Sequence, residues 1–381
     1  MKTKIGGDKL NKKKCNGCGA ELQSNDENRA GYVPKDKLKK TGNVVCKRCF
    51  QITNYGKYVP VGIADEEYIE EVKMIIKELD VVILILDIID FEGSFNEKIL
   101  NIIRDKPIIV AINKIDLVPT DKHPSEISDW VKKRFIEKRI NPLDISIISA
   151  KTRYGVNGIL TKLNHFYKGR TNVGVVGVTN VGKSTVINRL LGNKKNLTVS
   201  KYPGTTLKIV KNIIPGTEFT LIDTPGIIPN GRISDMVCHE CNLKIVPSSE
   251  ISRMTFKMEK DRVLMLGGLA VIRVLNEEGE KPIFAAFASK DVKFHKTNIN
   301  RIEDMKSKHI GEMLIPPCNN CKDEYSSLKM KKEVHTVNEG EELVLKGLGW
   351  LSVKRGPLKV EVELPENAEI IIRKAFIVPR R

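Results

Sequence analysis

"GVTNVGKST" (residues 177–185) stands near the middle of this chain of 381 residues. It fits the pattern G-x-x-x-x-G-K-[ST] and falls where an apolar run, "NVGVVG", gives way to a helical pattern. Gly177 and Gly182 let the backbone approach phosphate oxygens closely, and the N–H groups that begin a helix attract anions. Lys183 is expected to reach the β- and γ-phosphates of a nucleotide, and Ser184 to bind Mg²⁺. The stretch therefore predicts a phosphate-binding loop (P-loop) between a strand and a helix.

Short apolar runs alternate with helical patterns on either side of this loop. Strands are predicted at residues 81–87, 107–113, 144–150, 172–177, 205–214 and 219–224, and helices at residues 66–79, 127–138 and 156–167. This alternation is typical of an α/β domain with a mostly parallel sheet covered by helices on both faces. From residue 231 onward the alternation stops, and runs such as "KPIFAAFAS" and "KVEVELP" predict a separate β-rich domain with some helix.

Two more stretches belong to the phosphate side of the site. "DTPG", which begins at Asp223, follows an apolar run. Asp223 is expected to hold Mg²⁺ directly or through water, and the Gly226 N–H to sense the terminal phosphate. In "KYPGTTL" a threonine is expected to complete the Mg²⁺ shell when the loop becomes ordered, and Thr206 is favoured over Thr205.

Two motifs at strand ends indicate which base is bound. In "NKID", the carboxylate of Asp116 can accept hydrogen bonds from N1–H and N2–H₂ of guanine, and adenine lacks this pair of donors. Asn113 and Lys114 are expected to brace the loop and cover the base. In "SAK", which ends at Lys151, a backbone N–H is expected to bond the base oxygen and the lysine stem to pack on the ring. Together with the P-loop and "DTPG", these motifs predict a GTP site.

The motifs give a role to each of their residues. Nucleotide contacts are expected from Asn113, Lys114, Asp116, Ser149, Ala150, Lys151, Gly177, Asn180, Val181, Gly182, Lys183, Ser184, Thr185, Asp223 and Gly226, catalytic roles from Lys183, Thr206, Gly226 and Asn180, and Mg²⁺ ligation from Ser184, Thr206 and Asp223. Many GTPases place a water-orienting glutamine where this chain has Ile227, so slow intrinsic turnover is expected. Asn180 resembles the asparagine that coordinates K⁺ in potassium-dependent GTPases. Its alternative role is to brace the loop.

The order of the motifs is unusual. "NKID" and "SAK" precede the P-loop, "PGTT" and "DTPG". With the five GTPase motifs numbered G1 to G5 from the P-loop onward, this is the order G4-G5-G1-G2-G3. This order resembles the circularly permuted GTPases. Four cysteines ahead of the domain and a β-rich tail behind it resemble the YqeH-type bacterial ribosome-assembly GTPases in particular. The resemblance implies GTP hydrolysis and a role in maturing the small ribosomal subunit.

The chain is thus expected to contain three domains. They are a zinc-binding module at residues 1–62, a circularly permuted GTPase domain at residues 63–230, and a β-rich RNA-binding domain at residues 231–381. When the chain of a parallel-sheet domain begins and ends at a different exposed loop, the residues of its ligand site still meet in space. Because the chain here leaves the GTPase domain just after "DTPGIIPNG", we expect the nucleotide state to move or order the C-terminal domain.

The first four of the eight cysteines predict a zinc site. Cys15 and Cys18 in "CNGC", with Cys46 and Cys49 in "CKRC", are expected to bind structural Zn²⁺, because disulfides are rare in the cytosol. Residues 1–60 carry 14 Lys or Arg and 5 Asp or Glu, which suits a module that binds RNA or a ribosomal protein. Buried free thiols and a merely solvated basic surface are the alternatives.

The other four cysteines lie in the tail. Cys238 and Cys241 of "CHEC" and Cys318 and Cys321 of "CNNC" form a second zinc site only if the tail brings the pairs together. The family resemblance does not lead us to expect them. His239 is expected to be a bystander, and a thioredoxin-like redox site is disfavoured because no βαβ pattern surrounds either pair.

Composition limits the partners and the compartment. A net charge of +17 and a pI of about 9.4 favour a polyanionic partner, although a Lys-rich soluble surface is the alternative. No apolar run approaches the roughly 18 residues of a membrane span, and the N-terminal stretch lacks the apolar core of a secretory signal. A cytoplasmic protein without a membrane partner is expected. Trp350 and Phe376 could stack on bases, but such residues are more often core.

These inferences favour a GTP-hydrolysing switch that binds ribosomal RNA or pre-ribosomal particles during small-subunit (30S) assembly. One alternative is an RNA-modification or translation-associated GTPase. Another is a non-catalytic RNA-binding protein with GTP as a structural ligand, which the missing glutamine keeps open.

Overall fold

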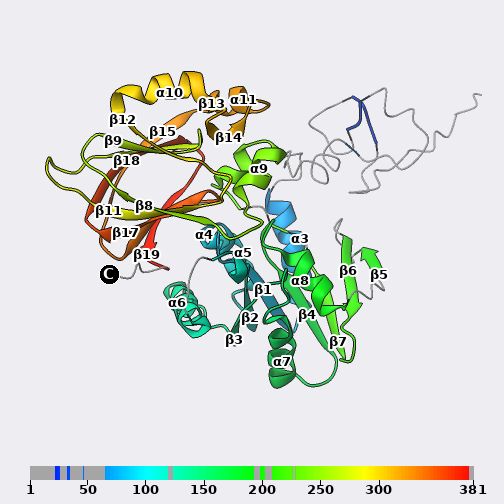
Figure 1. Ribbon diagram of the computed structural model, residues 1–381. Helices are drawn as coiled ribbons and strands as arrows, with labels where there is room; N and C mark the ends of the chain where they lie inside the picture. The colour runs from blue at the N-terminus through cyan, green and yellow to red at the C-terminus, as the bar shows by residue number, and fades with distance from the viewer. Residues whose placement is uncertain are drawn as a thin grey trace, which may run out of the picture. The chain divides into compact units, whose positions relative to one another are not determined.

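The computed structural model describes residues 22–25, 32–34, 46, 65–118, 123–192, 198–201, 208–224, 226–227 and 229–376 (Figure 1). The chain divides into two compact units, Met1–Glu71 and Val72–Arg381. In the first unit, Gln23 and Tyr32 form an isolated β-bridge, and the Val33 N–H donates to the Gln23 carbonyl at 2.8 Å.

The second unit contains a seven-stranded sheet with the order β3-β2-β1-β4-β7-β6-β5. Its strands are β1 (Val81–Asp87), β2 (Ile108–Asn113), β3 (Asp144–Ile147), β4 (Thr171–Val176), β5 (Thr198–Lys201), β6 (Lys208–Ile213) and β7 (Phe219–Asp223). The strands from β3 to β7 in this order run parallel, and β6 and β5 add an antiparallel edge. Every residue of β1 and β2 is buried, as their unbroken apolar runs predict. The prediction of a mostly parallel α/β domain is confirmed.

Helices precede and connect these strands. They are α3 (Asp65–Lys77), α4 (Phe91–Ser94), α5 (Glu97–Ile103), α6 (Pro124–Glu137), α7 (Val156–Phe166) and α8 (Lys183–Leu190), with a 3-10 turn η1 (Ile115–Leu117). In α6, the His123 side chain and the Glu126 side chain cap the first turn reciprocally. Ile127, Val131 and Phe135 recur every four residues and are buried, so one stripe of α6 faces the core.

The carboxyl ends of the parallel strands bring the predicted motifs to one edge of the sheet. Asp87 at the end of β1 pairs in register with Asn113 at the end of β2. Strand β4 ends at Val176, directly before the P-loop, and β7 ends at Asp223 of "DTPG". Open parallel sheets bind ligands at this edge, so the fold collects motifs that lie far apart in the sequence.

The C-terminal part contains two five-stranded antiparallel sheets, with the orders β12-β9-β10-β18-β15 and β19-β16-β17-β11-β8 (Figure 1). The strands are β8 (Ser252–Lys257), β9 (Arg262–Leu266), β10 (Ala270–Val274), β11 (Ile283–Ala288), β12 (Phe294–Asn298), β15 (Met330–Val337), β16 (Glu341–Leu345), β17 (Gly349–Arg355), β18 (Leu358–Pro365) and β19 (Ile370–Lys374). One buried cluster draws on both sheets, through residues such as Leu264 and Phe284, so the sheets pack face to face as a sandwich. The predicted β-rich tail is confirmed, and Trp350 and Phe376 are core residues.

Shorter elements surround the sandwich. They are η2 (Ile233–Met236), α9 (His239–Ile245), η3 (Ile299–Arg301), α10 (Ile302–His309), β13 (Ile310–Gly311), β14 (Leu314–Cys318) and α11 (Lys322–Ser326). Met305 of α10 packs with Val263 and Met265, which face away from the main core of the sandwich. None of the helices that the structure describes combines the length and the apolar character needed to cross a membrane.

Buried ion pairs join the sandwich to the helices of the seven-stranded sheet. Arg373 on β19 reaches Glu92 on α4 (Nη1 to Oε1, 3.3 Å) and Glu342 on β16 (Nη2 to Oε2, 2.9 Å). Arg134 on α6 contacts the same Glu92 at 2.9 Å. Because Arg373 and both carboxylates are almost fully removed from water, each depends on its partners to offset the cost of desolvation.

Candidate active site

The P-loop has the backbone shape that its glycines predict. A Cβ added at Gly177 would lie 2.9 Å from the Ile85 carbonyl oxygen. Gly182 has φ +89°, and a Cβ there would lie 2.4 Å from Nδ2 of Asn113. Both positions therefore require glycine. Helix α8 begins at Lys183 directly after the loop, so the N–H groups of its first turn lie at the loop.

One buried amide side chain holds three loops of the site together. Nδ2 of Asn113 donates to the Val181 carbonyl at 2.8 Å, in the P-loop. Oδ1 of Asn113 accepts from the Ala150 N–H at 2.9 Å, in "SAK". The P-loop, "NKID" and "SAK" thus meet at Asn113, as expected for parts of one site.

The base-reading side of the site is open. Asp116 is partly exposed in η1 and lines a pocket together with Ser149 and Thr152. Lys114 adopts φ +70°, and its Nζ lies 2.5 Å from Oδ2 of Asp87 at the end of β1. This contact ties the Lys114 side chain to the end of β1, while the part-exposed Asp116 carboxylate stays accessible to hydrogen-bond donors.

The "SAK" loop is fixed by contacts from elsewhere in the unit. The Arg189 Nε of α8 donates to the Ala150 carbonyl at 2.9 Å. Ser149 is buried, and its Oγ accepts from the Thr152 N–H at 3.1 Å. Lys151 donates to the Ser248 carbonyl at 2.6 Å, so its ammonium reaches the segment that follows α9.

The phosphate side places a cation beside a carboxylate. Lys183 Nζ lies 2.6 Å from Asp223 Oδ1 and also donates to the Thr224 carbonyl. Ser184 and Thr185 are exposed at the start of α8. Thr205 and Thr206 lie outside the described residues.

The end of "DTPG" is tied to the P-loop. A Cβ added at Gly226 would lie 3.6 Å from Cγ2 of Thr179. The Thr179 N–H donates to the Ile227 carbonyl at 3.2 Å, and Ile227 forms an isolated parallel bridge with Val178. The Ile227 side chain is buried, so its position offers an apolar side chain and no group that could orient water. Asn180 is exposed and adopts φ +68°.

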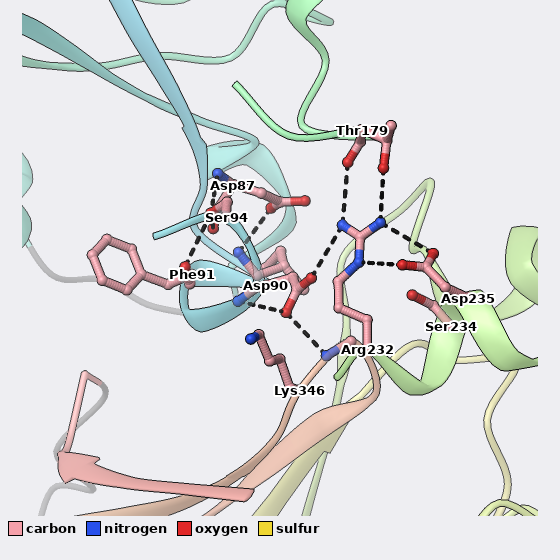
Figure 2. Close-up of polar contacts among 12 residues, drawn as sticks. Asp87, Asp90, Phe91, Ser94, Thr179, Arg232, Ser234, Asp235 and Lys346 are labelled. Atoms are coloured by element: carbon pink, nitrogen blue, oxygen red, sulfur yellow. Dashed lines mark hydrogen bonds and ion pairs between the residues drawn. The ribbon is translucent and has the colours of Figure 1, made fainter. Parts of the chain in front are cut away.

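An arginine just beyond this segment contacts the P-loop (Figure 2). The Arg232 guanidinium donates to the Thr179 carbonyl (Nη1, 3.2 Å) and to Oγ1 of Thr179 (Nη2, 3.0 Å), and it pairs with Asp235 at 2.9 Å. Its Nη1 also lies 3.6 Å from Oδ2 of Asp90, which follows β1. The Arg232 side chain is only 4% exposed, so these partners are what compensate its charge.

The same cluster reaches the C-terminal sandwich. Oδ1 of Asp90 accepts from the Gly347 N–H at 3.0 Å, and the Ile233 N–H donates to the Lys346 carbonyl at 2.9 Å. Burial raises the pKa of Asp90, and the Arg232 guanidinium opposes that rise. We call Asp90, Thr179, Arg232, Asp235 and Gly347 the junction cluster.

Sequence reasoning missed the junction cluster. "DIID" (residues 87–90) does carry a signal, because Asp87 ends a buried strand and Asp90 follows it at the ligand edge of the sheet. Arg232, which pairs with Asp90, does not belong to any comparable motif. Arg232 lies in "NGRIS", which reads only as a turn.

The tail cysteines come together, whereas the N-terminal ones are largely outside the described residues. The Sγ atoms of Cys238, Cys241, Cys318 and Cys321 all lie within 4.8 Å of one another and could hold a metal ion. His239 is not part of this group. Of the N-terminal set, Cys46 is described and buried, while Cys15, Cys18 and Cys49 are not among the described residues.

Three family models match the chain. A model described as "50S ribosome-binding GTPase" matches residues 172–277, "YqeH-like, C-terminal" matches residues 281–376, and "Elongation factor Tu GTP binding domain" matches residues 64–168. The GTPase matches therefore lie on both sides of the point where β4 begins, as the permuted motif order predicts.

Whole-chain relatives decide the family. The "Uncharacterized protein YqeH" of Bacillus subtilis is 32% identical over 370 residues, which cover 95% of this chain and 99% of that protein. The chain belongs to the YqeH family. "NO-associated protein 1, chloroplastic/mitochondrial" of Arabidopsis thaliana is 27% identical over 89% of this chain and 69% of its own length. Among solved structures, GNP-bound YlqF from T. maritima has a TM-score of 0.28 and 20% identity, over 42% of this chain and 57% of that chain.

This YqeH-family chain is a circularly permuted P-loop GTPase. GTP hydrolysis by such a domain implies GTP and Mg²⁺ as its ligands. The Lys183 and Asp223 pair fits them, because phosphate oxygens suit the ammonium and a hard cation suits the carboxylate.

Proposed function

We propose that this GTPase is a switch that binds ribosomal RNA or pre-ribosomal particles and assists assembly of the small ribosomal subunit. The observation that carries the proposal is the contact of Arg232 with Thr179, which joins the P-loop to the segment leading into the sandwich. A change at the γ-phosphate can alter the P-loop and the "DTPG" segment together. The junction cluster then passes the difference to an RNA-binding domain.

In the proposed GTP complex, Asp116 reads the guanine base and Asn113 and Lys114 hold the base-reading loop. The "SAK" residues Ser149, Ala150 and Lys151 complete the base pocket. The open pocket beside Asp116 supports this assignment, because it leaves the carboxylate free to pair with N1–H and N2–H₂.

The P-loop residues Gly177, Asn180, Val181, Gly182, Lys183, Ser184 and Thr185 are assigned to the phosphates. Asp223, Ser184 and Thr206 are assigned to Mg²⁺, and Gly226 to the γ-phosphate. The closeness of Lys183 to Asp223 supports this division. In the complex, Lys183 would turn from the carboxylate to phosphate oxygens, which leaves Asp223 to the metal.

Hydrolysis without a water-orienting glutamine needs another source of charge stabilisation. We assign it to K⁺ held by Asn180, whose exposed side chain stands at the loop. Turnover should then be at least about tenfold faster in potassium chloride than in sodium chloride at equal ionic strength. Asn180→Ala should remove that difference, and equal wild-type rates in the two salts would contradict the assignment.

The partner is proposed from charge and family. A net charge of +17 suits RNA as a partner. We place the protein in the cytoplasm. We also propose that the basic N-terminal module contacts RNA or ribosomal proteins and holds Zn²⁺ through Cys15, Cys18, Cys46 and Cys49. A specific observation favours a second candidate, the large subunit, because the matching family model is described as a 50S ribosome-binding GTPase.

Co-sedimentation with purified small and large ribosomal subunits tests the proposal. It is run at about 150 mM salt, because so basic a protein binds any RNA when ions are scarce. The samples contain a non-hydrolysable GTP analogue, GDP or no nucleotide. Binding to the small subunit that depends on nucleotide supports the proposal. Nucleotide-dependent binding to the large subunit alone favours the second candidate. Equal binding to both subunits in every nucleotide state contradicts both candidates.

A further inference from the structure

The four tail cysteines have the geometry of a metal site. Sγ of Cys318 lies 3.6 Å from that of Cys238 and 3.8 Å from that of Cys321, and Sγ of Cys321 lies 3.6 Å from that of Cys241. Four thiolates about 2.3 Å from a tetrahedral Zn²⁺ are separated from one another by about 3.8 Å. The cluster therefore has the size of a filled zinc site before any ion is considered.

Other interpretations of the cluster fit less well. A disulfide needs its sulfurs about 2.05 Å apart, and the four cysteines are free in the structure. Both C-x-x-C pairs also face each other, whereas a dithiol redox site needs only one pair. A merely packed set of thiols gives no reason for four sulfurs from two distant sequence pairs to gather at a single point.

The elements around the cluster prepare the cysteines as ligands. Cys238 immediately precedes α9 and Cys241 lies within it, while Cys318 ends β14 and Cys321 immediately precedes α11. The Cys318 N–H donates to Sγ of Cys241 at 3.0 Å, and such bonds stabilise a thiolate. Three of the four side chains are buried, and four cysteine ligands fill a tetrahedral coordination sphere, as in structural rather than catalytic zinc sites.

We propose that Cys238, Cys241, Cys318 and Cys321 bind one structural Zn²⁺, which clamps the segment leaving the GTPase domain to the C-terminal sandwich. The clamp joins α9 to β14 and α11, and it links Cys241 to Cys318, which lie 77 positions apart in the sequence. All four sulfurs lie in or against the main core of the sandwich. Zinc suits four thiolates in a closed site better than harder divalent ions do.

The clamp has a mechanical consequence. Arg232 lies six residues before Cys238, so the chain between the P-loop contact and the metal is short. A metal at the cluster holds η2 and α9 in a fixed position against the sandwich. This inference stands without the proposed ribosomal function, because it concerns only metal content and stability.

The test must separate this site from the N-terminal cysteines. Full-length protein is purified with zinc and a reductant, and metal per chain is measured by mass spectrometry of the elements. A variant with Cys15, Cys18, Cys46 and Cys49 all changed to Ser should keep about one zinc per chain. Adding Cys241→Ser and Cys318→Ser should remove it. His239→Ala is the matched control, since it lies between two ligands and should keep the metal.

A second measurement needs no variant. Wild-type protein is treated with a thiol-alkylating reagent with and without a chelator, and each cysteine is read separately in peptides. Cys238, Cys241, Cys318 and Cys321 should be protected until the chelator is added, and the melting temperature should fall by several degrees with it. Rapid alkylation of these four without chelator, an intact disulfide among them, or iron in place of zinc would overturn the proposal.

Discussion

At the scale of single residues, the proposed GTP complex assigns the choice of base to Asp116. In that complex its carboxylate accepts from two donors of guanine, whereas an amide in the same place offers one acceptor and one donor. Asp116→Asn should therefore weaken GTP binding by at least about 100-fold. The same variant should bind xanthosine triphosphate more tightly than wild type does, because xanthine presents a carbonyl where guanine has its amino group.

Isothermal titration with both nucleotides measures this exchange. Asp129→Asn is the control, because Asp129 is an exposed carboxylate on nearby α6. GTP affinity that stays within threefold of wild type in Asp116→Asn would show that another residue reads the base.

Much of this site could be predicted from residues alone. The P-loop, "NKID", "SAK" and "DTPG" are short motifs whose residues act mostly within a few positions of one another, so spacing identifies them. The bridge made by Asn113 to Val181 could not be predicted, because it joins loops 68 residues apart. For the same reason the sequence suggested the tail cysteine cluster only conditionally.

At the scale of elements, the segment after β7 is the part that should respond to nucleotide. Arg232→Ala removes both hydrogen bonds to Thr179 and leaves the part-buried Asp90 carboxylate without this guanidinium. We expect the ratio of RNA affinities with a GTP analogue and with GDP to fall toward one. Fluorescence anisotropy with a fragment of small-subunit RNA measures this ratio.

The control for this variant is Arg273→Ala. Arg273 on β10 also pairs with an aspartate, Asp261, at 2.6 Å. It carries the same charge and lies in the sandwich, but it has no contact with the P-loop among the described residues. If both variants change the ratio equally, the effect comes from charge and the junction cluster does not transmit nucleotide state.

Helices and strands whose residues form one uninterrupted pattern in the sequence could be predicted. Strands β1 and β2 are unbroken apolar runs, and α6 carries a capping residue and a regular stripe. The antiparallel edge formed by β5 and β6 was not predicted, because a short strand with mixed polarity looks the same in either direction. The pairing order of the sandwich also depends on contacts between distant strands.

At the scale of the whole molecule, the sandwich and the GTPase sheet are joined by the buried ion pairs of Arg373. Arg373→Met leaves Glu342, which is 0% exposed, without this guanidinium. Breaking a buried pair on one side costs about 3–5 kcal/mol, so the free energy of unfolding should fall by that amount in a denaturant titration.

Lys374→Met is the matched control one residue away. Lys374 pairs with Glu341 at 2.9 Å, but its side chain is 78% exposed. An exposed pair contributes at most about 1 kcal/mol, so this variant should be nearly as stable as wild type. Equal losses in the two variants would mean that the buried network does not hold the two parts together.

The central claim is that the permuted chain passes its nucleotide state to the sandwich through the exit segment. The direct measurement is the RNA affinity ratio between GTP-analogue and GDP states, in wild type and in an Arg232→Ala chain that also carries a flexible Gly-Ser insert after the exposed Asn230, so that both the junction contact and the chain connection are interrupted. Gly231 follows the insert, and its carbonyl accepts from the Glu369 N–H at 3.0 Å, so the sandwich side stays anchored. We expect the insert and the Arg232→Ala change together to abolish the nucleotide dependence while GTP hydrolysis continues. An unchanged ratio in the inserted chain would contradict the central claim.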